Sequence, residues 1–125
     1  MRTMLTYDYA IVRVVPRVER GEFLNAGVIL SSVSAKFLGA RIELSAARLD
    51  AFSPGIDTDF VRDALDSIPA ICAGIGSLAH FSLRERFHWL TAPRSTILQT
   101  SPVHTGRCDD LDVALERLMD RMVRV

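Results

Sequence analysis

The first third of the chain carries its hydrophobic residues in the short runs that are typical of β-strands. Segments 7–15, 23–30 and 36–44 are rich in β-branched and aromatic residues, and polar turns separate them. The third segment alternates strictly, so that its aliphatic side chains share one face: Leu38, Ala40, Ile42 and Leu44. These three segments predict an antiparallel meander with an apolar face.

A helical period replaces this alternation in the middle of the chain. Apolar residues within 60–68 form one stripe behind an acidic first turn, and Pro69 is expected to kink or end this helix. Ser82 and Glu85 have the spacing of a capping box, which predicts the start of a second, shorter helix. A third helix, with Asp109 as its expected N-cap, carries the clearest apolar stripe: Leu111, Ala114, Leu115, Leu118, Met119 and Met122.

These elements predict an α+β domain. Segment 95–101 is a weaker strand candidate, which gives the order β-β-β-α-α-β-α over residues 1–125, with no linker or internal repeat. We expect a two-layer fold in which the helices pack on one face of an antiparallel three- or four-stranded sheet. A chain of 125 residues, 49% of them hydrophobic, can bury such a single core without disulfides or metal.

Charge and composition narrow the classes of function. The 15 basic and 15 acidic residues balance, so coating of nucleic acid or of an anionic membrane is not expected. No apolar run approaches the roughly 20 residues that span a bilayer, and the first residues lack the apolar core of a signal peptide. We therefore expect a cytoplasmic protein. Cys72 and Cys108 stand in no metal-binding cluster, and no nucleotide-binding motif occurs, so neither metal nor cofactor is expected.

Polar residues interrupt the apolar pattern of each predicted strand, and if these interruptions project to the same side they form one patch on the sheet. This group consists of Arg13, Asn25, Arg41 and Glu43, and Gly27 leaves room above it. Charged groups are costly to bury unless they are paired. Two interpretations stay open, because the charges could pair with one another or could hold a ligand.

A second polar group occupies residues 86–107, with the sequence RFHWLTAPRSTILQTSPVHTGR. Its prolines and glycine fix loops, and its arginines and hydroxyls are directional donors that suit a phosphate or a carboxylate. The polar residues are Arg86, His88, Arg94, Ser95, Gln99, Thr100, Ser101, His104, Thr105 and Arg107. Ser, Thr and Pro also favour ordinary turns and caps, so a purely structural interpretation stays open as well. Trp89 is expected to lie in the core.

Five segments carry a family resemblance: YDYAIVRVVPRVERGEFLNAGVIL, FLGARIEL, RFHWL, APRSTILQTSPVHTG and CDD. In this order they resemble the bacterial family called domain of unknown function 3037 (DUF3037), over nearly the whole chain. The resemblance implies a small stand-alone bacterial protein and an association with HipA-like kinases, as a partner or accessory protein. By motif match it carries over Arg20, Gly21, Glu22, Asn25 and Gly27, and then Arg86, His88, Pro93, Arg94, Ser95, Gln99, Thr100, Ser101, His104 and Gly106.

We expect a binding or accessory module for an anionic ligand or a partner protein, such as a HipA-like kinase. The expected binding residues come from both polar groups: Arg13, Glu22, Asn25, Arg41, Arg86, Arg94, Ser95, Gln99, Thr100, Ser101, His104 and Thr105. An alternative is a small enzyme of phosphoester or acyl-transfer chemistry, with His88 or His104 as general base and Arg86 and Arg94 stabilising negative charge. In a third interpretation the polar residues only staple loops, and the exposed sheet face forms a homodimer.

Overall fold

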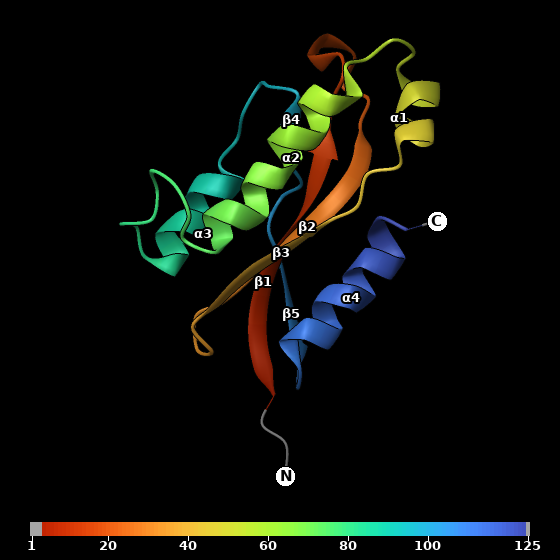
Figure 1. The fold of residues 1–125 in the computed structure, drawn as a ribbon. Coiled ribbons are helices and arrows are strands. Elements are labelled where there is room, and N and C mark those ends of the chain that lie inside the picture. Colours follow the sequence, from red (N-terminus) through yellow and green to blue (C-terminus); the bar gives the residue numbers. More distant parts are fainter. Residues whose placement is uncertain (1–3, 125) are drawn as a thin grey trace.

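A computed structural model describes residues 4–124 as an antiparallel sheet with helices on both faces (Figure 1). The strands are β1 (Leu5–Val14), β2 (Leu24–Ser32), β3 (Phe37–Ile42), β4 (Leu98–Thr100) and β5 (His104–Cys108). The helices are α1 (Ala46–Phe52), α2 (Thr58–Cys72), α3 (Leu83–Thr91) and α4 (Leu111–Met122), with a short 3-10 helix η1 (Val18–Arg20). The α+β class and the order of the main elements are confirmed, and α1 and β5 are additional to the expected set.

Strand β1 lies in the interior of the sheet. One of its edges pairs with β2, which in turn pairs with β3. The other edge is shared, because β4 pairs with the C-terminal part of β1 and β5 with the N-terminal part. Between β4 and β5, the N–H of Ser101 donates to the carbonyl of Ile11 at 2.8 Å, and the N–H of Ile11 donates to Ser101 Oγ at 2.8 Å. A side-chain hydroxyl therefore replaces a carbonyl in the ladder where the edge strand is interrupted.

Both faces of the sheet are buried, each against different helices. Val12 and Val14 pack with the apolar residues of α1, α2 and α3, whereas Ile11, Val28 and Leu30 pack with those of α4. The expected packing of all helices on one face is corrected here, since α4 covers the second face and the sheet has five strands (Figure 1). The physical reason is that the central residues of β1 and β2 are apolar on both sides, and such strands need cover on both faces.

The helix ends follow local side-chain chemistry. The capping box of Ser82 and Glu85 is complete at the start of α3, as its spacing predicts. Helix α4 is capped by Asp110, whose side chain accepts a main-chain hydrogen bond, and not by Asp109. Pro69 lies inside α2 and does not end it. Within residues 4–124, no helix combines the length and apolar character needed to cross a membrane.

Candidate functional site

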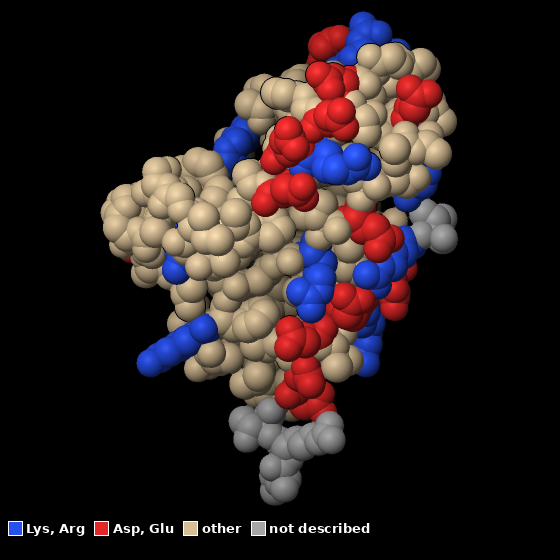
Figure 2. Space-filling model, in the orientation of Figure 1, with Lys and Arg blue, Asp and Glu red and all other residues tan. Residues whose placement is uncertain are grey.

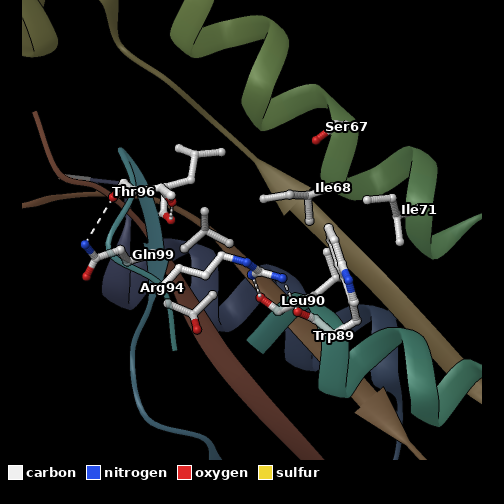
Figure 3. A pocket seen from close by; sticks show the side chains of 11 residues that line it. Ser67, Ile68, Ile71, Trp89, Leu90, Arg94, Thr96 and Gln99 are labelled. Atoms are coloured by element: carbon white, nitrogen blue, oxygen red, sulfur yellow. Dashed lines mark hydrogen bonds between the residues drawn. The ribbon is translucent and has the colours of Figure 1, made fainter. Parts of the chain in front are cut away.

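A hollow of about 180 Å³ opens between α2, α3 and β4 (Figure 3). Its walls are apolar side chains from β1, α2, α3 and β4: Val12, Ile68, Ile71, Leu90 and Leu98. Its rim carries the indole of Trp89 and the guanidinium of Arg94. The hollow therefore combines an apolar interior with one cation, which is an arrangement suited to an apolar group that bears a negative charge.

Arg94 is held at this rim by the end of α3. Its Nη1 donates to the carbonyl of Leu90 at 3.0 Å, its Nη2 donates to the carbonyl of Trp89, and its Cζ lies 4.4 Å from the centre of the Trp89 ring. A cation at a helix C-terminus satisfies carbonyls that have no intrahelical partner. Among the described residues, however, no carboxylate lies within salt-bridge distance of Arg94, so no anion compensates its charge.

Trp89 does not lie in the core as expected. Its side chain packs under Arg94 at the surface, and 44% of the residue is exposed. An indole pinned by a guanidinium offers a rigid apolar face beside a cation. This exposed face was missed because a tryptophan at helical spacing looks the same in sequence whether it packs inward or lines a surface hollow.

Strand β4 forms the opposite side of the hollow. Leu98 and Thr100 face the helices, since their partners across the ladder lie on the face that α2 and α3 cover. Gln99 lines the edge of the hollow, but its amide turns away and its Nε2 donates to the carbonyl of Thr96 at 3.1 Å (Figure 3). Of the predicted binding residues on this strand, Thr100 faces the hollow and Gln99 does not.

Arg86 lies away from the hollow and closes the C-terminal end of α2. Its Nη1 donates to the carbonyls of Ile71 and Cys72 at 3.0 and 2.9 Å, and its Nε donates to the carbonyl of Phe81 at 3.2 Å. Only 9% of the residue is exposed. Arg86 therefore has a structural role in place of the ligand contact that its sequence context suggests.

The two histidines of the enzyme hypothesis do not converge with these arginines. His88 is exposed on α3, and His104 is exposed on β5 with its ring 5.5 Å from that of Tyr9. Neither imidazole lines the hollow that holds Arg94. The described residues also contain no group of three or more His, Cys, Asp or Glu side chains that could hold a metal ion. The structure does not assemble the general base and charge-stabilising pair that this hypothesis requires.

The polar group on the sheet is largely paired within the molecule. Arg41 Nε lies 3.0 Å from Glu116 Oε1 of α4, and Glu43 Oε1 lies 3.0 Å from Arg124 Nε. Arg41 and Glu43 share the face that α4 covers, whereas Gly27 pairs with Val12 and Ile42 and lies on the opposite face, so the expectation that Gly27 leaves room above this group is wrong. Mutual pairing is thus the correct interpretation for Arg41 and Glu43. Arg13, on the same face, has no carboxylate within salt-bridge distance among the described residues.

The remaining predicted binding residues are dispersed. Glu22 pairs with Arg20 at 2.5 Å next to η1, and neither residue lines the hollow. Ser95 is exposed in the loop between α3 and β4, and Ser101 is buried in the interrupted edge strand. The structure therefore separates residues that the sequence groups in one short segment.

Sequence inspection missed a network centred on Asp8. Arg84 Nη2 donates to Asp8 Oδ2 at 2.7 Å, Thr105 Oγ1 donates to Asp8 Oδ1 at 2.8 Å, and Arg84 Nη1 donates to Ser31 Oγ at 3.1 Å. Burial works to raise the pKa of Asp8, but the hydrogen bonds from Arg84 and Thr105 outweigh it and hold the pKa below its usual value. The network joins α3 to β1, β2 and β5. The only feature of the sequence that indicates this network is an acidic residue, Asp8, within a predicted strand.

Comparison with known proteins identifies the family of the chain. The family model described as "Protein of unknown function (DUF3037)" matches residues 9–123. The chain belongs to the DUF3037 family. The match includes both the hollow and the polar group on the sheet, so both are parts of the DUF3037 domain itself. No curated protein and no solved structure matches this DUF3037 chain.

Proposed function

We propose that this DUF3037 protein is a binding module that holds a short segment of a partner protein. One apolar side chain of the partner enters the hollow, and a carboxylate next to it meets Arg94. The observation that carries the proposal is an apolar hollow with an uncompensated guanidinium at its rim.

The size of the hollow favours a side chain over a cofactor. An apolar cavity of about 150 Å³ is large enough for benzene, so about 180 Å³ accommodates one branched aliphatic or aromatic side chain. Pockets for cofactors and drug-sized molecules are larger, at roughly 300–1,000 Å³. Of the two ligand classes expected from sequence, the volume therefore supports a segment of a partner protein more than an anionic ligand of cofactor size.

The surface around the hollow suits protein contact. No Asp, Glu, Lys or Arg occurs from Ser67 to Leu83. Figure 2 shows correspondingly few charged side chains over α3 and the loop before it, whereas charges crowd along α4. Ile75 in this loop is 65% exposed. A partner that covers this area removes little charge from water, and exposed Trp and Arg side chains are enriched among the residues that dominate binding energies.

The family resemblance supplies a first candidate for the partner, a HipA-like kinase. A segment of that kinase with a Leu, Phe or Met beside an Asp or Glu has the required chemistry. The enzyme alternative is not carried forward, because no observation in the structure favours it.

The only tryptophan of the chain is Trp89, so its fluorescence reports on the hollow directly. A matched pair of probes, 4-methylpentanoate and 4-methylpentanamide, shares the apolar group and differs in charge. We expect both to change Trp89 emission and the carboxylate to bind about fivefold more tightly, as for a solvent-exposed ion pair worth about 1 kcal/mol. The variant Arg94→Gln should remove this preference, and Arg107→Gln on exposed β5 should keep it.

Co-expression with a HipA-like kinase tests the partner. Ser67→Phe places a ring in the hollow and should abolish co-purification, whereas Arg107→Gln should retain it. The proposed function is wrong if neither probe changes Trp89 emission, or if Arg94→Gln leaves the preference for the carboxylate intact. Binding of the probes without co-purification would exclude the kinase while keeping the binding module.

A further inference from the structure

Two buried side-chain atoms stand out for lacking a hydrogen-bond partner. Among the described residues, these atoms are Arg13 Nε and Asn25 Oδ1, a donor and an acceptor. Arg13 and Asn25 are direct partners in the ladder between β1 and β2, so their side chains lie next to each other on one face. Leaving a buried polar group unpaired is costly, so each such group calls for an explanation, and an ordered water, an ion or another bound molecule can supply it.

The orientation of Asn25 is fixed by α4. Its Nδ2 donates to the carbonyl of Met122 at 3.0 Å, so its Oδ1 is the atom left to accept a hydrogen bond from elsewhere. The contact with Met122 is also where α4 ends. Gln99 of β4 pairs with Arg13 on the other edge of β1, so Asn25, Arg13 and Gln99 form a row of polar residues across the sheet.

Arg13 is a cation in this row without an anionic partner. Among the described residues its guanidinium makes no hydrogen bond or salt bridge, and its Cζ instead lies 4.0 Å from the centre of the Phe23 ring. Phe23 is 44% exposed and precedes β2. The ring of Phe23 therefore covers one side of the Arg13 guanidinium.

We infer that Arg13 and Asn25 bind a carboxylate whose α-carbon carries an N–H group. The Nε and one Nη of a guanidinium form a fork that matches the two oxygens of a carboxylate. The neighbouring N–H of the same molecule donates to Asn25 Oδ1, which a carboxylate alone cannot do. This chemistry occurs in an N-acyl amino acid and at the C-terminal residue of a peptide, and the ring of Phe23 turns aside to admit it.

This site is independent of the hollow. Arg13 alternates along β1 with Val12, which lines the hollow, so Arg13 points to the opposite face of the sheet. A ligand at Arg13 therefore does not compete for the space beside Trp89, and the two proposals can fail separately.

The test follows the Arg13 Nε–H and Asn25 side-chain amide signals of the intact protein by NMR. The probes are N-acetylglycine, N-acetylglycinamide, acetate and the peptide acetyl-Ala-Ala-Gly with a free carboxylate. We expect N-acetylglycine to shift both signals and to bind about tenfold more tightly than the amide or acetate, which each lack one of the two groups. Arg13→Lys should lose the fork and this preference, whereas Arg48→Lys, at an arginine that already has a carbonyl partner, should keep them.

The other outcomes are equally informative. If the Arg13 Nε–H contacts only water and no probe shifts it at millimolar concentration, the two atoms share a buried water and the inference is wrong. Tighter binding of the peptide than of N-acetylglycine would identify a chain end as the source, and equal binding would identify the free amino acid derivative. Phe23→Ala should increase affinity for N-acetylglycine, and a decrease would refute the role of the ring as a cover.

Discussion

Replacement of Arg86 by methionine tests whether this arginine stabilises the fold or binds a ligand. Methionine keeps much of the apolar stem and removes the guanidinium, so the carbonyls of Ile71, Cys72 and Phe81 lose their donor. The bond to Cys72 is buried and the other two are partly buried. Counting about 2 kcal/mol for the first and about 1 kcal/mol for each of the others gives a loss of about 4 kcal/mol in the free energy of unfolding.

Urea unfolding followed by far-UV circular dichroism measures this loss, with an unchanged slope showing that the unfolded state is not altered. The matched control is Arg94→Met, because Arg94 also donates to two carbonyls at the end of a helix but lies at the surface. We expect that variant to lose about 1 kcal/mol or less. A loss below about 1 kcal/mol for Arg86→Met, together with loss of binding to 4-methylpentanoate, would refute the structural role of Arg86.

Three further outcomes follow from other contacts. Gly106→Ala should destabilise the protein by about 1–3 kcal/mol in urea unfolding, because its Cβ would lie 2.5 Å from the ring of Tyr7, and a smaller residue at position 7 should recover part of the loss. The pKa of Asp8 is lower in the folded state than its unfolded value of about 3.9, so its contribution to stability is complete above that pH and is lost as the pH falls through the folded value. Asp8→Asn should remove this part of the acid dependence in pH-dependent unfolding, and an unchanged profile would contradict the role of Arg84. Burial raises the pKa of the Cys72 thiol to about 11, so iodoacetamide at neutral pH should modify it only as fast as the protein opens.

The local part of the fold could be predicted from the sequence because it depends on neighbours in the chain. The capping box of Ser82 and Glu85 lies within one helical turn, and the apolar stripe of α4 repeats at a fixed helical spacing. The burial of the second face of the sheet could also be predicted, since β1 and β2 carry continuous apolar runs. Strand β5 could not be predicted, because its residues are mostly exposed and polar and its register is set by β1, far away in the chain.

The sequence alone determined most of the strands and helices and the family, since periodicity and turn chemistry act over a few residues, whereas the side of the sheet that Asn25 shares with Arg13 depends on an irregularity in the pairing of β1 with β2. Only the tertiary structure decided what each arginine does. A guanidinium binds a carboxylate, a helix-end carbonyl or a ligand with similar donors, and the acceptor is chosen by which groups the fold brings within about 3 Å. Arg86 meets the end of α2 because the chain reverses between them, whereas Arg94 remains at a rim and Arg13 beside an unpaired amide oxygen.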